Sequence, residues 1–137
     1  MRVGPPFEIS RIDHVLLLVD GMQESLAFYE GVLGCVVESR LPEYGMVELR
    51  AGSSHLDLVD VAAAEGSWAR PEVRNGRNVD HVALRLDGCT ERALREHLAA
   101  SRTPIAEERI EDDGLMSFYV RDPSGNTIEL AAVAASP

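Results

Sequence analysis

Residues 12–21 read IDHVLLLVDG, and residues 79–88 read VDHVALRLDG. The two histidines, His14 and His81, are 67 positions apart, and so are the Asp-Gly pairs that close the two stretches. A repeat at a constant offset predicts that one structural unit occurs twice in the chain. Because one of the shared polar residues is a histidine beside a hydrophobic run, two half-sites related by pseudo-symmetry are a natural way to build a metal site.

The composition is that of one compact domain. The chain has 137 residues, of which 45% are hydrophobic and 26% charged, with a net charge of −10. This acidity opposes binding to nucleic acid, and no apolar run approaches the ~18 residues that a membrane span needs. Cys35 and Cys89 are not repeat equivalents and form no CxxC pair, so we expect two reduced thiols in a cytoplasmic protein.

Hydrophobic periodicity predicts two βαβββ modules within a single domain spanning 1–137, joined by a linker over 63–78. In module one, about 11–62, Asp20 is the expected N-cap of the helix, which ends near Gly34. Module two covers about 79–133. The predicted strands are 11–19, 35–41, 45–50, 55–61, 79–86, 105–110, 115–120 and 127–133, with a second helix at 90–101. The fold class is therefore α+β.

Strand alternation places four polar side chains on the faces turned away from the helices. Glu129 lies between Ile128 and Leu130, and a buried carboxylate in that position is costly without a partner. The four inward residues are His14, Asp57, His81 and Glu129. Two imidazoles and two carboxylates suit a divalent ion such as Zn²⁺, Ni²⁺, Co²⁺ or Mn²⁺. A single histidine on an apolar strand is more often a core residue, so the repeat carries this hypothesis.

The sequence resembles the vicinal oxygen chelate superfamily, which includes glyoxalase I, bleomycin-resistance proteins, fosfomycin-resistance thiol transferases and extradiol dioxygenases. The resemblance rests on the two Asp-His stretches, on residues 25–34 (SLAFYEGVLG) and on residues 118–130 (FYVRDPSGNTIEL). The last of these matches the pattern DPxGNxxEL and is the most specific. The similarity covers roughly residues 11–133.

The resemblance implies one divalent metal ion per site, with Zn, Ni, Co, Mn or Fe as candidates. His14, His81 and Glu129 fall on ligand positions of metal-dependent members, and Asp57 falls on the fourth. Glyoxalase I-like relatives usually carry glutamate at that fourth position, so Asp57 is a departure. His55, about 7 Å along the same strand, is an alternative ligand.

The resemblance further implies a lyase or isomerase that chelates two neighbouring oxygens of a small substrate, with Glu129 as proton shuttle and Asp57 or Glu48 as its counterpart. Glu48, His55 and Arg85 are candidate substrate-binding residues, Arg85 for an anionic group. Two alternatives stay open. One is metal-dependent transfer of a thiol cosubstrate to an epoxide. The other is a metal-free protein that sequesters a small molecule, although such binders generally lack the histidine–carboxylate set.

The resemblance also implies that the two modules form curved half-barrel sheets around a cavity. Each such module has an exposed sheet edge, which another module normally covers. We therefore expect a homodimer, as the resemblance also implies. Whether one chain or two chains build each site is left open by the sequence.

Overall fold

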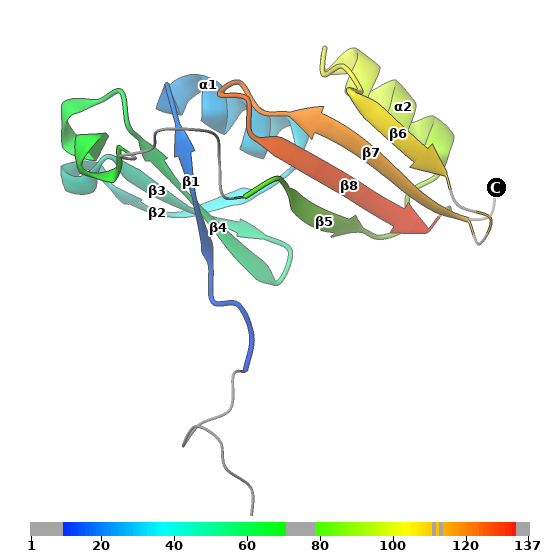
Figure 1. The fold of residues 1–137 in the computed structure, drawn as a ribbon, viewed down its shortest axis with the longest axis horizontal. Coiled ribbons are helices and arrows are strands. Elements are labelled where there is room, and N and C mark those ends of the chain that lie inside the picture. Colours follow the sequence, from blue (N-terminus) through cyan, green and yellow to red (C-terminus); the bar gives the residue numbers. More distant parts are fainter. Residues whose placement is uncertain (1–9, 71–78, 111, 113, 134–137) are drawn as a thin grey trace, which may run out of the picture.

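The computed structural model describes residues 10–70, 79–110, 112 and 114–133. It contains two four-stranded sheets with the orders β1-β4-β3-β2 and β5-β8-β7-β6. In each sheet the first strand runs parallel to the last, and the other neighbours are antiparallel. The sheets lie side by side and do not close into a barrel (Figure 1). The α+β fold with the predicted order of strands and helices is confirmed.

Module one holds β1 (Val15–Val19), α1 (Met22–Leu26), the π-helical η1 (Ala27–Val32), β2 (Val36–Leu41), the 3₁₀ turn η2 (Pro42–Tyr44), β3 (Met46–Ala51), β4 (Ser54–Asp60) and the 3₁₀ helix η3 (Ala64–Ala69). Module two holds β5 (Val82–Leu86), α2 (Glu91–Ala100), β6 (Glu107–Ile110), β7 (Leu115–Arg121) and β8 (Thr127–Val133). Residues 71–78, part of the predicted linker, lie outside the described residues.

Both repeated strands begin later than predicted. β1 begins at Val15 and β5 at Val82, so His14 and His81 immediately precede their strands. The apolar run that follows each histidine therefore forms the strand, while the histidine itself stays exposed at its start. The prediction that the two histidines lie within these strands is therefore wrong in both modules, and in the same way.

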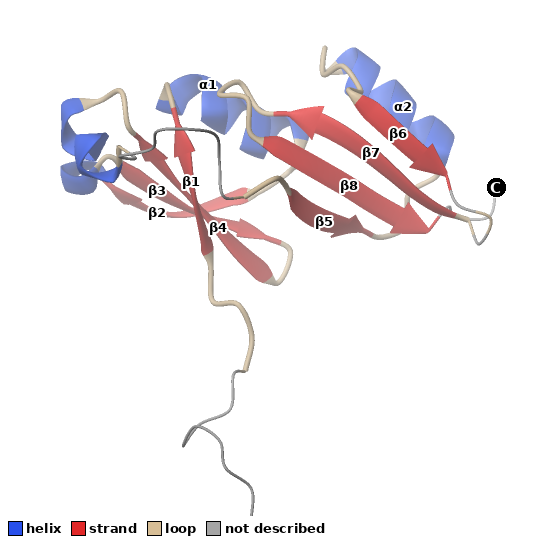
Figure 2. Ribbon diagram, in the orientation of Figure 1, coloured by secondary structure: helices blue, strands red, loops and turns tan. Residues whose placement is uncertain are grey.

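The helices α1 and α2 lie on the same side of the sheets (Figure 2). In α2, Leu94 and Leu98 are buried at a spacing of four residues, which places them on one helix face. Thr90 Oγ1 accepts a hydrogen bond of 3.1 Å from the Ala93 amide and so caps this helix. In η1, Phe28 and Tyr29 are buried in the same core. The opposite faces carry Asp57 and Glu129 together with apolar neighbours such as Leu16 and Ala83.

The cap of α1 corrects the prediction that Asp20 would serve there. Gly21 occupies the N-cap position without a side-chain bond, and the carboxylate comes from Asp60 at the end of β4. Asp60 Oδ1 accepts from the amides of Gly21 (3.2 Å) and Ala62 (3.0 Å), while Oδ2 accepts from Met22 (3.0 Å). The pattern around Asp20 could not reveal a cap supplied 40 residues later in the chain.

The turn between β7 and β8 joins the two modules. Asp122, 4% exposed, accepts a hydrogen bond of 2.8 Å from the buried hydroxyl of Tyr29 in module one. Asn126 donates through Nδ2 both to Asp122 (2.8 Å) and to the carbonyl of Leu18 (3.0 Å). The conspicuous DPSGN sequence therefore has a structural role, because it docks module two onto module one.

Cys35 is buried and Cys89 is half-buried, and both are free thiols, as the sequence predicts. Within the described ranges, no helix is both long enough and apolar enough to span a membrane.

Candidate metal centre

Asp57 and Glu129 occupy equivalent places in the two sheets. Asp57 pairs with Leu16 on β1, and Glu129 pairs with Ala83 on β5. Leu16 and Ala83 are themselves 67 positions apart, as the histidines are. Strand register therefore places one carboxylate beside each repeated histidine, and the equivalence inferred from strand alternation holds in three dimensions.

The module-one half-site consists of His14 and Asp57. His14 Nε2 lies 3.8 Å from Asp57 Oδ2, and its Nδ1 lies 2.8 Å from Asp13 Oδ2. The His14 side chain is 49% exposed, whereas Asp57 is 4% exposed. Burial of the Asp57 carboxyl raises its pKa, and the nearby His14 ring partly offsets this rise. The hydrogen bond to Asp13 raises the pKa of His14, and the charge of Asp57 adds to that effect.

A polar hollow of about 430 Å³ opens over this half-site. It is lined by Arg11, Asp13, His14, Glu38, Ser39, Glu48, His55 and Asp57. Glu48 lies directly opposite Asp57 on the neighbouring strand, and His55 Nδ1 lies 3.2 Å from Glu38 Oε1. The structure therefore places the predicted Glu48 and His55 in the same hollow as His14 and Asp57.

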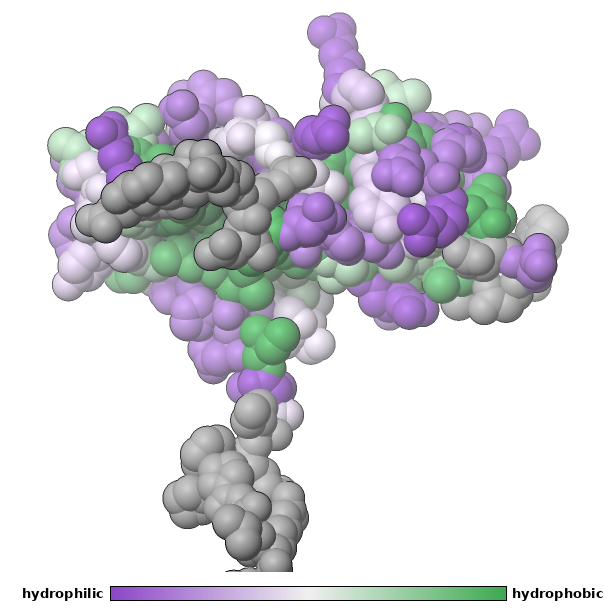
Figure 3. All heavy atoms as spheres, in the orientation of Figure 1, coloured by the Kyte–Doolittle hydropathy of each residue, from purple (hydrophilic) through white to green (hydrophobic). Residues whose placement is uncertain are grey.

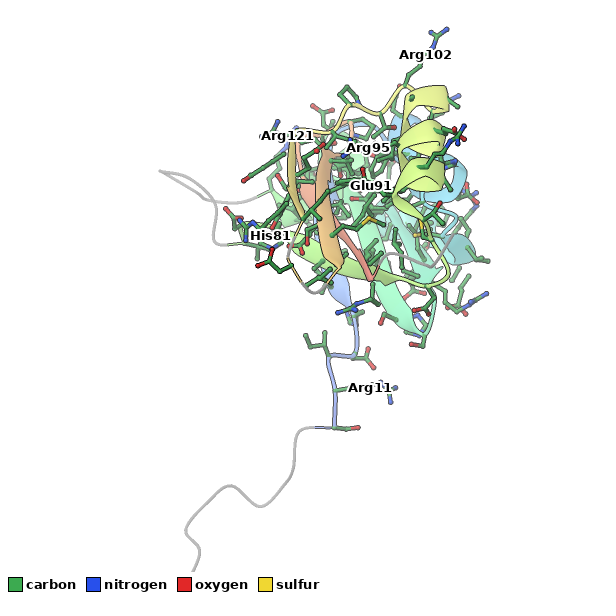
Figure 4. All side chains as sticks on the ribbon, turned by 90° about the vertical axis from the view of Figure 1, so that its right-hand side faces the viewer. Arg11, His81, Glu91, Arg95, Arg102 and Arg121 are labelled. Atoms are coloured by element: carbon green, nitrogen blue, oxygen red, sulfur yellow. The ribbon has the colours of Figure 1, made fainter. Side chains whose placement is uncertain are left out.

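The module-two half-site is more tightly organised. His81 Nε2 lies 3.1 Å from Glu129 Oε1, and His81 Nδ1 lies 2.8 Å from Asp80 Oδ2. Ser117 donates a hydrogen bond of 3.0 Å to Glu129 Oε2. The hydrogen bond between Tyr119 and Glu129 raises the pKa of Tyr119, and the Tyr119 ring meets His81 edge-on at 5.6 Å. In Figure 4 His81 lies on the side of the sheet opposite Glu91 and Arg95 of α2.

The two half-sites remain apart in the single chain. No group of three or more histidine, cysteine, aspartate or glutamate side chains in the described part converges closely enough to hold a metal ion. Arg85 lies away from the hollow that contains His14. It lines two other hollows between the modules, and Leu33 lines both of them as well. The structure thus pairs His14 with Asp57 and His81 with Glu129, and joins neither pair to the other.

Several residues of the half-sites were not selected from the sequence. Asp13 and Asp80 contact the two histidines. The sequence does indicate them, because they occupy equivalent positions in the two repeated stretches. Ser117 and Tyr119 reach Glu129 from the neighbouring strand β7, and only the pairing of β7 with β8 reveals their place.

The donor atoms fit a divalent cation. A neutral imidazole that carries its proton on Nδ1 presents a lone pair at Nε2, and an ionised carboxylate presents only lone pairs. His81 Nε2 and Glu129 Oε1 stand 3.1 Å apart, so a cation between them, either a proton or a metal ion, relieves their repulsion. His14 and Asp57 repeat the arrangement at 3.8 Å. Each pair therefore offers two of the donors that a divalent ion needs, and the two pairs do not meet within the described part of one chain.

Comparison with known proteins identifies the family of the chain. The profile of the glyoxalase/bleomycin resistance protein/dioxygenase superfamily matches residues 11–130, nearly the whole chain. The chain belongs to this superfamily. The matched range includes both histidine stretches and the docking turn at Asp122, so the superfamily pattern and the observed duplication cover the same residues.

Two proteins resemble the chain in sequence, and a more distant one shares its fold. The lactoylglutathione lyase of Salmonella typhimurium is 27% identical over 122 residues, covering 88% of this chain and 90% of its own. The crystal structure of lactoylglutathione lyase from Agrobacterium tumefaciens has 27% identity and a TM-score of 0.70, and the match covers 91% of this chain and 95% of that one. The fosfomycin resistance protein FosX from Listeria monocytogenes shares the fold, with a TM-score of 0.70, 17% identity and coverage of 91% and 94%.

Proposed function

We propose that the protein is a divalent-metal-dependent enzyme of the glyoxalase I-like type, which catalyses isomerisation or lyase chemistry on a small substrate. The observation that carries this proposal is the recurrence of one histidine–carboxylate pair at the same place in both modules. Retention of both pairs favours a metal enzyme over a metal-free binding protein. With two free thiols and no disulfide between them, we further propose that it works in the cytoplasm.

When bound, the ion supplies Lewis-acid polarisation of substrate oxygens. The chain itself must then move a proton between neighbouring carbon atoms, and Glu129 is the best-placed group. Ser117 and Tyr119 both hydrogen-bond to its carboxylate, which fixes the direction in which that group is presented. Glu48, opposite Asp57, is the counterpart on the module-one side.

We propose that a homodimer completes the site, with module one of one chain facing module two of its partner. Each half-site exposes its histidine, and an apolar residue two positions earlier is exposed as well: Ile12 is 78% exposed and Val79 is 58% exposed. Ile12 and Val79 are repeat equivalents. Hydrophobic residues also reach the surface over the module-one sheet in Figure 3. Burial of these side chains at a shared interface would favour association.

Kinetics on the metal-loaded dimer tests the proposed reaction. We would screen α-ketoaldehydes mixed with a thiol, acyl-CoA epimers and epoxides, and then compare wild type with Glu129→Gln at saturating metal. Loss of the Glu129 proton carrier is expected to reduce kcat by at least about 100-fold. Full activity of Glu129→Gln, or turnover of none of these substrates by a metal-loaded protein, would contradict the proposal.

One observation supports a second reaction on the same site. Asp57 is one methylene shorter than glutamate and lies 3.8 Å from its histidine, which favours a set of three protein ligands in place of four. Such a set suits transfer of a thiol to an epoxide. In the screen, an epoxide consumed only in the presence of thiol would support this reaction over isomerisation.

A further inference from the structure

In both half-sites the histidine contacts the aspartate that directly precedes it in the chain. Asp13 Oδ2 lies 2.8 Å from His14 Nδ1, and Asp80 Oδ2 lies 2.8 Å from His81 Nδ1. In both rings the other nitrogen, Nε2, is the atom nearer the carboxylate of its own sheet. The contact is thus kept at both copies of the repeat.

We propose that Asp13 and Asp80 are positioning residues, each of which holds the proton of its histidine on Nδ1 and leaves the Nε2 lone pair directed at the metal position. This inference rests on the proposed function, because it concerns the same site. In a neutral imidazole one ring nitrogen carries the proton and the other carries a free lone pair. If Nδ1 donates its proton to a hydrogen bond, Nε2 therefore presents the lone pair. A carboxylate bonded to the remote nitrogen also makes the ligating nitrogen more basic.

The exposure of the two aspartates separates this role from one in stability. Their side chains are 82% and 83% exposed, and a hydrogen-bonded ion pair at the surface contributes little to the free energy of folding. Substitution there should leave the fold intact. A change in metal affinity would then report on the presentation of the histidine and not on unfolding.

The repeat supplies matched controls. Asp20 and Asp87 belong to the same two stretches, are also exposed, and make no hydrogen bond or ion pair with either histidine in the described ranges. We would measure the Kd for Zn²⁺, by competition with a chelating dye, in Asp13→Ala, Asp80→Ala and the double variant, beside Asp20→Ala and Asp87→Ala. Each positioning variant should bind about tenfold more weakly and the double variant more weakly still, whereas the controls, with the same change in charge, should match wild type.

The conservative variants separate the hydrogen bond from the charge. Asp13→Asn and Asp80→Asn keep an acceptor for the Nδ1 proton, so their affinity should lie between those of wild type and the alanine variants. Zn²⁺ affinity equal to that of wild type in Asp13→Ala/Asp80→Ala would overturn the inference, as would an equal loss in the Asp20 and Asp87 controls.

A second readout does not depend on metal. The nitrogen NMR shifts of His14 in the metal-free protein, recorded well above the ordinary histidine pKa, report which nitrogen carries the proton. His14 suits this test because its Nε2 lies 3.8 Å from Asp57, beyond hydrogen-bond distance. We expect the Nδ1–H form in wild type and a loss of this preference in Asp13→Ala. A proton on Nε2 in wild type would overturn the inference. A wild type that binds no Zn²⁺ but keeps the Nδ1–H form would instead contradict the proposed function.

Discussion

Asp57 and Glu129 are structural counterparts that reach their histidines to different extents. The distance from the histidine Nε2 to the nearest carboxylate oxygen is 3.8 Å for Asp57 and 3.1 Å for Glu129. Backbone register is the same at the two positions, since both residues pair with repeat-equivalent partners. The shorter side chain of Asp57 therefore explains the wider gap, and it makes module one the weaker half of the candidate metal centre.

Lengthening that side chain should strengthen the centre. Asp57→Glu is expected to tighten the binding of a divalent metal by about tenfold, as a gain of about 1.4 kcal/mol from one improved charged contact implies. Titration calorimetry with Zn²⁺ measures the change. His55→Gln is measured beside it, because His55 is the alternative ligand on the same strand; its pairing with Glu38 predicts that this variant keeps wild-type affinity. An unchanged affinity in Asp57→Glu would place Asp57 outside the ligand set.

Mixed dimers test whether two chains share each site. A chain with His14→Ala and Asp57→Asn lacks the module-one half, and a chain with His81→Ala and Glu129→Gln lacks the module-two half. If each site combines halves of different chains, a mixed dimer has one intact site and one empty site. Each parent protein should bind no metal, whereas the isolated mixed dimer should bind metal at about half the wild-type stoichiometry. No recovery in a mixed dimer verified by native mass spectrometry would mean that each chain builds its own site.

The contact between Tyr29 and Asp122 should contribute to stability. Tyr29→Phe removes a buried donor to a carboxylate and is expected to lower the free energy of unfolding by about 2 kcal/mol, as urea denaturation would show. Tyr44→Phe is the matched control, because Tyr44 is 54% exposed and should change stability little. Equal stability of the two variants would contradict a docking role for the turn.

Asp60 should stabilise the protein in a pH-dependent way. Burial alone would raise the pKa of Asp60, but hydrogen bonds from backbone amides, including those of Gly21 and Met22, outweigh it and lower the pKa below its ordinary value of 3.8. The stabilisation is therefore complete above that value and is lost as the pH falls through the folded-state pKa.

Asp60→Ala is accordingly expected to cost about 1–2 kcal/mol at neutral pH and progressively less in acid. Denaturation across a pH series measures this difference. Asp20→Ala, at the position that the sequence pattern favours as the cap, should have little effect. A cost for Asp60→Ala that does not change with pH would argue against the charged cap.

Much of this architecture could be predicted from local patterns. Asp57 lies between the buried Leu56 and Leu58, and Glu129 lies between the buried Ile128 and Leu130. Because burial of one face enforces a period of two along a strand, this alternation predicts that both carboxylates lie on the opposite face of their sheets. The repeat further predicts that each module places one histidine beside its carboxylate. These inferences needed only neighbours along a strand and a constant offset.

Other features depend on contacts between distant segments. The capping of α1 by Asp60 and the hydrogen bonds of Ser117 and Tyr119 with Glu129 arise from chain crossings that periodicity does not encode. Arg85 shares its strand face with the histidine position, yet it lines the hollows between the modules, because the packing of the modules and not the strand alternation decides which cavity it faces. The separation of the two half-sites within one chain likewise depends on how the modules dock.

The most direct test of the account is the metal content of the purified protein per chain, measured together with its native mass before and after treatment with a chelator. We predict a homodimer with about one divalent ion per chain, in which removal of the ion lowers thermal stability and restoration of the ion recovers it. A dimer that is free of metal, equally stable and unable to take up Zn²⁺, Ni²⁺, Co²⁺, Mn²⁺ or Fe²⁺ would contradict the account and leave a small-molecule binding protein as the better description.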